Sequence, residues 1–285
     1  MHLPAISLDK RFVLVSLDAG LWLPELLRGK NSNANDLEKN IPLLRLVLAE
    51  AMTTLSPELT GVEVGPVVGF DSLTRKSFQS GCLISLDRRN QEVDPLSLPL
   101  FAPDWGVEHI RNNYGVVSLR LAYHPSEKLA NDKQKLVAEV ADHCRYEGVD
   151  LFLEIILTPS ADAKKGTPLW QEAQLVAANE MGRLVNLLAL EYPGDALSCA
   201  TLTAQLDIPW ILLDSGVGYS KLKEQLRVVL EGGGRGMMMQ NSIWDGLPTT
   251  SGDELDDRLV GFIKNELRDR VMEMKRIIIE SPSLA

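Results

Sequence analysis

Residues 208–244 read IPWILLDSGVGYSKLKEQLRVVLEGGGRGMMMQNSIW, and this stretch decides the fold. Its apolar runs and its amphipathic centre predict a strand, a helix and a second strand over 208–213, 219–230 and 236–239. A turn of small and polar residues follows each strand. Two strands joined by a crossover helix match the last two units of a (β/α)8 barrel, where phosphate groups often bind to backbone N–H groups.

The two turns are therefore candidate ligand-binding segments. Neither turn contains a lysine or an arginine, and Asp214 places a negative charge beside them. We expect phosphate to bind poorly there, because carboxylate and phosphate repel each other. The substrate-binding candidates from these turns are Asp214, Ser215, Gly216, Gln240, Asn241 and Ser242.

The rest of the chain repeats the same alternation. Six further strands are predicted over 11–17, 62–70, 81–86, 116–123, 150–157 and 185–190. Helices are predicted over 35–55, 105–112, 132–146, 169–184 and 196–206. Eight strands in alternation with helices predict an α/β fold, a single (β/α)8 TIM barrel over about 11–246 within one domain of residues 1–285. Residues 252–279 are predicted to form a terminal helix that packs on the barrel.

Composition restricts the class of partner. The chain has 285 residues, 45% of them hydrophobic, and a formal net charge of −10. That balance argues against nucleic acid and anionic membranes, which attract clustered Lys and Arg, and leaves a small molecule as the expected ligand. Three widely spaced cysteines, no secretory leader and no apolar run near 20 residues indicate buried thiols in a cytoplasmic protein.

Four short segments, taken in order, resemble class I tagatose-bisphosphate and sulfofructose-phosphate aldolases. They are Phe152-Leu-Glu154-Ile, Leu188-Ala-Leu-Glu191-Tyr-Pro193, Leu213-Asp-Ser-Gly216-Val217 and Ser242-Ile-Trp244. The resemblance extends over nearly the whole chain and includes Asp18, the Trp105–Tyr123 segment and the helix that contains Lys133. It implies an aldolase-type barrel with its site at the carboxyl ends of the strands.

The resemblance also implies functional residues that this chain has replaced. The aldolases use a strand-six lysine, which forms a Schiff base with the ketose carbonyl, and the matching residue here is Ala189. Their strand-four lysine falls on Ser118, a Gln-Arg pair falls on Ala19-Gly20, and the arginine of a Gly-Arg-Ala turn falls on Asn241. We therefore expect a barrel that binds a small polar or sugar-derived ligand without Schiff-base aldolase activity.

Alternation along the strands places a charged group at the barrel mouth. In a strand, residues two apart point to the same face, so each of the following pairs shares a face. The pairs are Ser16 and Asp18, Ser118 and Arg120, Phe152 and Glu154, Ala189 and Glu191, and Leu212 and Asp214. The aldolase register points these faces inward. Asp18, Arg120 and Glu154 are the catalytic candidates, and Ser118 and Glu191 join the substrate-binding candidates.

Several interpretations stay open. Arg120 could pair with Glu154 or Glu191 in a structural network, since buried charges need partners. Alternatively, Asp18, Glu154, Glu191 and Asp214 could hold a cationic ligand, Mg²⁺ or Mn²⁺. An active carbon–carbon lyase with that metal or with a relocated lysine is a further alternative, and Lys76, Lys164 and Lys165 lie in segments that could reach the mouth.

Two other features carry open alternatives. His124 after strand four could carry a proton, bind a metal, or simply belong to a His-Pro turn. The terminal helix has more apolar residues than one packed face needs, so it could mediate a homodimer or be buried on the barrel wall. These residues are Leu259, Phe262, Ile263, Val271, Met274 and Ile278.

Overall fold

The structure is a computed structural model that describes residues 2–17, 49–66, 80–88, 97–160, 164–247 and 255–282. Its strands are β1 (Phe12–Ser16), β2 (Gly61–Val64), β3 (Gly81–Ser85), β4 (Val116–Tyr123), β5 (Leu151–Leu157), β6 (Leu187–Leu190), β7 (Trp210–Leu213) and β8 (Gly236–Met239). Its α-helices are α4 (Val107–Asn112), α5 (Ala130–Glu147), α6 (Pro168–Gly182), α7 (Ala196–Gln205), α8 (Tyr219–Glu231), α9 (Leu255–Phe262) and α10 (Arg268–Glu280).

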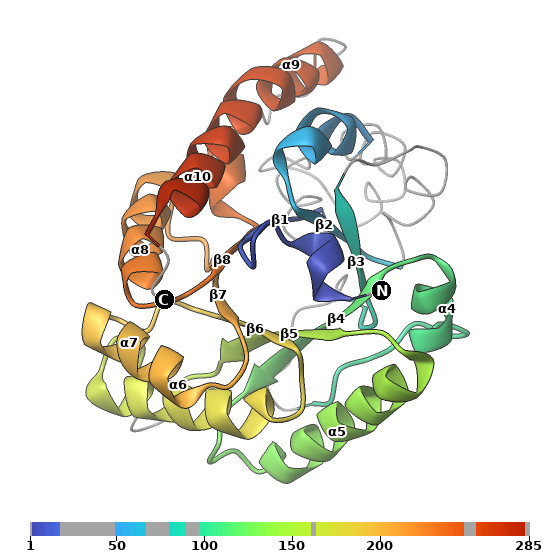
Figure 1. The fold of residues 1–285 in the computed structure, drawn as a ribbon, viewed down its shortest axis with the longest axis vertical. Coiled ribbons are helices and arrows are strands. Elements are labelled where there is room, and N and C mark those ends of the chain that lie inside the picture. The colour runs from blue at the N-terminus through green and yellow to red at the C-terminus, as the bar shows by residue number, and fades with distance from the viewer. Residues whose placement is uncertain are drawn as a thin grey trace.

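The eight strands form a closed parallel barrel in sequence order, β1 to β8, as predicted (Figure 1). The barrel closes where β1 pairs with β8, with Phe12 opposite Gly236. Gly236 has φ 145°, and a Cβ at that position would lie 1.9 Å from the carbonyl oxygen of Phe12. Only glycine lets the two backbones approach this closely, so the closure depends on this residue.

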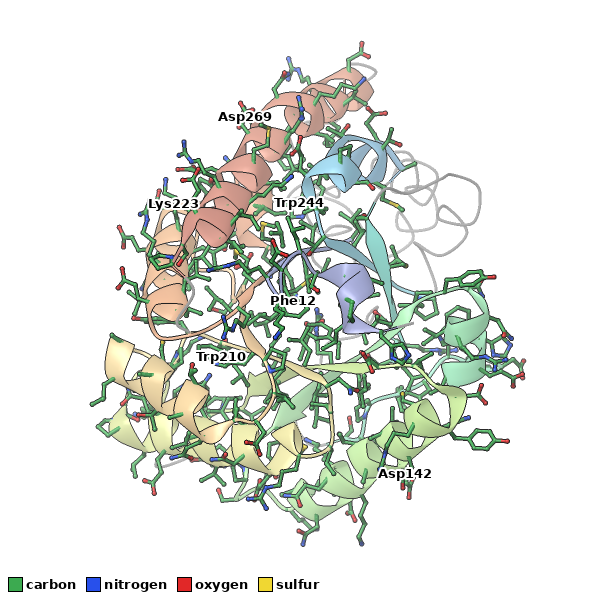
Figure 2. All side chains as sticks on the ribbon, in the orientation of Figure 1. Phe12, Asp142, Trp210, Lys223, Trp244 and Asp269 are labelled. Atoms are coloured by element: carbon green, nitrogen blue, oxygen red, sulfur yellow. The ribbon has the colours of Figure 1, made fainter. Side chains whose placement is uncertain are left out.

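Helices surround the barrel, and both faces of the strands are buried. One apolar cluster lies between strands and helices and includes Leu212, Met237 and Trp210. A second cluster fills the barrel interior and includes Phe12, Phe152 and Ala189. Figure 2 shows Phe12 near the centre of the ring, with Asp142 and Asp269 on the surrounding helices.

The amino-terminal segment fills the lower end of the barrel, where the strands begin. A short 3-10 helix, η1 (Leu3–Ile6), contributes Ile6 to the interior cluster. A Cβ at Gly81 would lie 2.1 Å from the carbonyl oxygen of Ala5, so glycine permits this contact. The backbone N–H of Leu3 donates to Asp150 at 2.7 Å, which fixes the segment beside the start of β5. The interior below the mouth is therefore closed by apolar side chains.

The terminal helix packs against β1, α8 and the short helix η2 (Ser56–Glu58). A π-helical turn, η4 (Ile263–Leu267), joins α9 to α10, and the whole runs from 255 to 280. The six apolar residues considered for a dimer interface are at most 5% exposed within one chain. Burial on the barrel wall is therefore confirmed for these residues. Self-association stays a prediction, and its interface would have to use other residues.

Element boundaries differ from the prediction in a few places. The strand expected over 62–70 is described only as Gly61–Val64, and residues 67–70 lie outside the description. Of the helix expected over 35–55, residues 49–55 are helical, and residues 35–48 lie outside the described residues. Strands six and seven each begin two residues later than expected, at Leu187 and Trp210. Among the helices described, none is long and apolar enough to cross a membrane.

Candidate active site at the carboxyl ends of the strands

Buried polar groups gather where the strands end. Above the apolar layers of the interior, alternate positions of the strands and the residues just beyond them become polar. The buried members are Ser16, Glu63, Ser85, Asp87, Ser118, His124, Glu154, Glu191, Asp214, Gln240 and Ser242. In a parallel barrel this end carries the ligand site, because the strand ends and the loops after them converge there.

Glu154 on β5 is a fully buried acid of the site. Its Oε2 lies 3.0 Å from both Nε and Nη2 of Arg120, and it accepts a hydrogen bond from Nε2 of Gln240 at 2.7 Å. Arg120 stands opposite Glu154 in the pairing of β4 with β5, as alternation predicts. The expected Arg120–Glu154 pair is confirmed, and its geometry satisfies the condition that a buried charge be paired.

Ala189 is the neighbour of Glu154 on the other side. The two residues are opposite each other in the pairing of β5 with β6, and Ala189 is fully buried in the interior cluster. A methyl group thus lies beside the central carboxylate. No lysine occurs in any of the eight strands over the bounds that the structure describes.

Glu191 has a cationic partner that the sequence analysis did not assign to it. Nζ of Lys165, in the loop between β5 and α6, lies 2.6 Å from Oε1 of Glu191. The lysine side chain is 54% exposed and the carboxylate 9%. Gln174 of α6 donates to the carbonyl oxygen of Glu191 at 2.7 Å, which holds the backbone in place. Lys165 therefore does reach the mouth, where it serves as an ion-pair partner.

Asp214 occupies the backbone donors of both turns. Oδ2 accepts from the N–H groups of Gln240 at 3.1 Å and Ser242 at 2.8 Å. Oδ1 accepts from the N–H of Gly216 at 2.9 Å and from the hydroxyl of Ser242 at 2.6 Å. Asp214 is only 3% exposed. These are donors of the kind that bind phosphate at the last two units of a barrel, and here an internal carboxylate uses them.

Two carboxylates were missed by the sequence analysis. Glu63 on β2 is fully buried and accepts a hydrogen bond from the hydroxyl of Ser118 on β4. Asp87 after β3 accepts from the backbone N–H of Arg120 at 3.1 Å. The alternation in Gly61-Val-Glu-Val64 contains the signal for Glu63, since a lone acid in an apolar strand points to a polar interior position.

The phase predicted for β7 is wrong. Ile211 and Leu213 belong to the interior cluster, and Leu212 belongs to the outer one. Asp214 reaches the site because its side chain turns toward β8 beyond the end of the strand. At the rim, Gly216 and Asn241 are exposed and Ser215 is half-buried, whereas Gln240 and Ser242 are buried and hydrogen-bonded internally.

The proposed metal ligands have separate partners in the structure. Glu154, Glu191 and Asp214 bind Arg120, Lys165 and the two turns respectively, and Asp18 lies outside the described residues. Over the described ranges, no three His, Cys, Asp or Glu side chains form a group that could hold a metal ion.

His124, just after β4, also lies at the mouth. It is 6% exposed, and its Nδ1 accepts from the backbone N–H of Ser126 at 3.2 Å and lies 2.8 Å from the Ser126 hydroxyl. In the neutral imidazole this leaves the proton on Nε2. Nε2 has no hydrogen-bond partner in the part of the chain that the structure describes.

Comparisons with known proteins support the fold. No protein-family model matches the chain. An archaeal fructose 1,6-bisphosphate aldolase superposes with a TM-score of 0.68 at 11% identity, over 98% of each chain. An archaeal aldolase structure with its catalytic lysine covalently bound to the carbinolamine intermediate gives 0.67 at 11% identity, over 97% of each chain. A fructose-bisphosphate aldolase from Slackia heliotrinireducens gives 0.64 at 15% identity, over 99% of this chain and 90% of that one. The chain thus has an aldolase-like TIM-barrel fold.

Proposed function

We propose that this protein binds a small, polar, sugar-derived ligand without a phosphate group at the mouth of the barrel, and that it forms no Schiff base. One observation carries the proposal: the carboxylate of Asp214 accepts hydrogen bonds from three backbone N–H groups of the two turns. A phosphate at those donors would have to displace a buried, hydrogen-bonded carboxylate. The repulsion between the two anions in a site of low dielectric opposes that exchange.

The polar groups that remain suit hydroxyl groups. Arg120 and Gln240 offer donors, Glu154 and Glu191 offer acceptors, and His124 offers an Nε2–H group. Donors and acceptors held in fixed positions recognise a polyhydroxylated molecule through paired hydrogen bonds. Ligand binding by such groups needs neither a phosphate anchor nor a covalent intermediate.

The absence of imine chemistry follows from Ala189. A Schiff base needs a neutral amine beside the ketose carbonyl, and a methyl group cannot supply one. Position 189 faces Glu154 inside the barrel, and the described strands bring no other lysine to that layer. Positioning and electrostatics are what such a site retains when the nucleophile is missing.

The second candidate function is a lyase with a relocated lysine, and Lys165 is the observation in its favour. Its Nζ lies 2.6 Å from Oε1 of Glu191, which follows the last residue of β6 and is two residues beyond Ala189. That contact ties Nζ to a carboxylate beyond the end of β6, however, and the lysine side chain is 54% exposed, whereas Ala189 faces Glu154 inside the barrel. We therefore assign Lys165 to ion pairing.

Borohydride trapping tests the proposal. The protein is incubated with fructose 1,6-bisphosphate or tagatose 1,6-bisphosphate, reduced with sodium borohydride, and examined by intact-mass and peptide mass spectrometry. We expect no sugar-phosphate adduct. An adduct on Lys165 would establish the relocated lysine, and an adduct on any other lysine would equally overturn the proposal.

Binding is measured separately by calorimetry with a panel of free ketoses, aldoses and polyols beside the two bisphosphates. We expect binding only among the unphosphorylated compounds, and its loss in Arg120→Gln. The matched control is Arg145→Gln, since Arg145 is 74% exposed on α5 and away from the mouth. Tighter binding of a bisphosphate than of its free sugar would contradict the proposal.

A further inference from the structure

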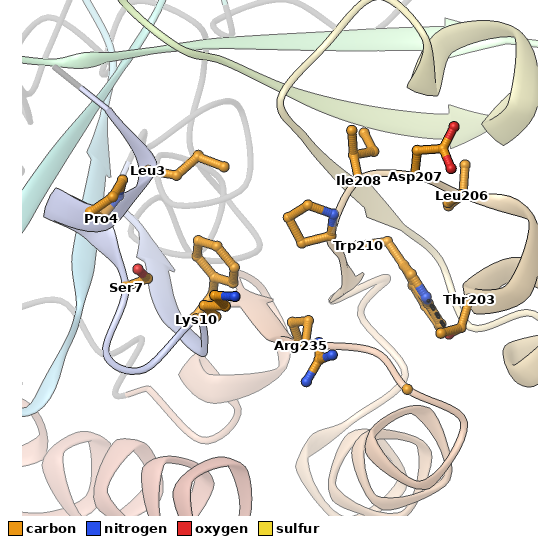
Figure 3. A pocket seen from close by; sticks show the side chains of 13 residues that line it. Leu3, Pro4, Ser7, Lys10, Thr203, Leu206, Asp207, Ile208, Trp210 and Arg235 are labelled. Carbon is orange, nitrogen blue, oxygen red and sulfur yellow. Dashed lines mark hydrogen bonds between the residues drawn. The ribbon is translucent and has the colours of Figure 1, made fainter. Parts of the chain in front are cut away.

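A cavity lies at the lower end of the barrel, opposite the mouth, where the strands begin. Its volume is about 420 Å³, and it is bounded by the amino-terminal segment, the first residue of β1, the start of β7 and the residue before β8 (Figure 3). The apolar interior cluster and η1 separate it from the mouth. It is therefore independent of the proposed function. A volume in this range accommodates a small organic molecule.

The wall of this lower cavity includes two buried aromatic side chains. Phe12 is 2% exposed and Trp210 is 1% exposed. The indole N–H of Trp210 is already used, because it donates to the hydroxyl of Thr203 at 2.8 Å. Ile208 and Pro209, which precede Trp210 in the chain, also line the cavity. The wall thus favours an apolar body, preferably a flat ring.

Two cationic side chains also line the lower cavity. Lys10 and Arg235 both line it, and neither side chain has a hydrogen bond or an ion pair to a residue of the described ranges. Asp207 is the one acid in the lining, and Figure 3 shows it on the far side from both cations. In a chain with a formal charge of −10, a pair of unneutralised cations beside an apolar wall is an unusual local charge.

The backbone holds Lys10 in an unfavourable conformation at this position. Leu8 and Arg11 exchange two backbone hydrogen bonds of 2.9 Å, and Asp9 and Lys10 between them have φ 49° and 61°. This is a type I′ turn, in which Asn-Gly is preferred and lysine is strained. Arg11 then donates to the carbonyl oxygen of Ile278 at 2.6 Å, which anchors the turn to the end of α10. The turn is held at both ends, and Lys10 projects from it.

Positive charge accumulates here. Burial, followed by the nearby charge of Arg235, lowers the pKa of Arg11. The guanidinium groups of Arg11 and Arg235 are therefore close enough to repel each other, and an anion would relieve that repulsion.

We infer that the lower cavity binds a small amphipathic anion, with an aromatic or short apolar body against Phe12 and Trp210 and a carboxylate or phosphate between Lys10 and Arg235. Hydrophobic burial supplies contact area, and the two cations select charge and orientation. Because the lower face of a TIM barrel is remote from the strand ends that carry chemistry, the site is a binding site separate from the mouth.

Nuclear magnetic resonance on the full chain tests the inference. The indole Nε1–H resonance of Trp210, assigned with Trp210→Phe, is followed during titration with benzoate, phenyl phosphate and indole-3-carboxylate, and with the neutral amide of each acid where one exists. We expect the dissociation constants obtained from the Trp210 resonance to be at least tenfold lower for the anions than for the amides. The comparison between the carboxylates and the phosphate identifies which acid group the site prefers.

Charge-neutral variants supply the second arm. Lys10→Gln and Arg235→Gln should each lower the affinity for the anions at least tenfold and leave the affinity for the amides unchanged. Arg145→Gln should change neither affinity. A urea midpoint equal to that of the parent protein shows that each variant is folded. Equal binding of acids and amides, or full affinity in both lysine and arginine variants, would overturn the inference. Perturbation of all tryptophan resonances without preference for Trp210 would overturn it as well.

Discussion

Replacement of Asp214 by asparagine tests the most densely bonded group of the barrel mouth. The carboxylate accepts four hydrogen bonds, two on each oxygen, from the backbone of Gly216, Gln240 and Ser242 and from the Ser242 hydroxyl. Asparagine has one acceptor oxygen and one NH₂ group. In either orientation of the amide, two donors lose their acceptor and face another donor.

The magnitude follows from that count. A hydrogen bond to a charged group contributes about 1.5–3 kcal/mol, and buried donors left unsatisfied add a desolvation cost. Two lost bonds therefore predict that Asp214→Asn lowers the free energy of unfolding by about 3–6 kcal/mol. That is a large part of the total stability of an ordinary domain, about 5–15 kcal/mol.

Urea unfolding, followed by circular dichroism and tryptophan fluorescence, measures the change. Asp245→Asn is the matched control, because the exposed Asp245 accepts one hydrogen bond, from Tyr219 N–H at 3.1 Å, and asparagine can still accept it. We expect the control to lose less than about 1 kcal/mol. A double-mutant cycle with Ser242→Ala should show coupling, since both residues belong to one network. A loss below 1 kcal/mol for Asp214→Asn would refute the network as described.

Three further predictions concern other parts of the chain. Burial, the dominant cause, raises the pKa of Cys144 to about 12, so the folded thiol keeps its proton at pH values where the unfolded thiol ionises. The free energy of unfolding should therefore fall as pH rises from about 8.5 toward 12, by up to about 1.4 kcal/mol per pH unit. Cys144→Ala should remove that part of the slope, measured between pH 8 and 10. Lys10→Gly should relieve the strain of the left-handed backbone conformation and raise the free energy of unfolding by about 0.5–1 kcal/mol. The same change should abolish anion binding at the lower cavity. No gain in thermal stability would count against the strained turn. Gly236→Ala should lower the free energy of unfolding by more than about 4 kcal/mol or abolish folding, since its Cβ would meet the backbone of Phe12. The control Gly261→Ala, with open space around it, should be neutral or stabilising by about 0.5–1 kcal/mol. A well-folded Gly236→Ala barrel would contradict the closure geometry.

The fold could be predicted because each strand is a short apolar run that ends at a turn. Residues 236–239 are a strand with the predicted bounds, and the alternation in β4 and β5 correctly places Arg120 beside Glu154. These strands contain polar residues, which fix the inward phase. β7 reads Trp-Ile-Leu-Leu, with no polar residue to fix its phase, and Leu212 was therefore assigned to the interior although it faces outward.

The partners of the site residues could not be predicted, because they depend on side-chain reach across loops and on register between distant strands. Ser118 meets Glu63 only through the combined register of β2, β3 and β4. Lys165 reaches Glu191 from a loop. Lys133, which the sequence places only on a helix, is fully buried, and its Nζ lies 2.8 Å from both the carbonyl oxygen of Ala122 and Oε1 of Glu127. A lysine enters the interior when such partners compensate its charge, and the sequence does not display them.

Calorimetric titration of the parent protein and of Asp214→Gly with fructose 1,6-bisphosphate and with inorganic phosphate tests the central claim most directly. The claim is that an internal carboxylate occupies the phosphate donors of the two turns. It predicts no binding to the parent protein at millimolar ligand. It also predicts that removal of the carboxylate frees the N–H groups of Gly216, Gln240 and Ser242, so that phosphate binds the variant and restores part of its lost stability, by about 1.4 kcal/mol at ten times the dissociation constant. Micromolar binding of the bisphosphate to the parent protein, with no gain in the variant, would contradict it.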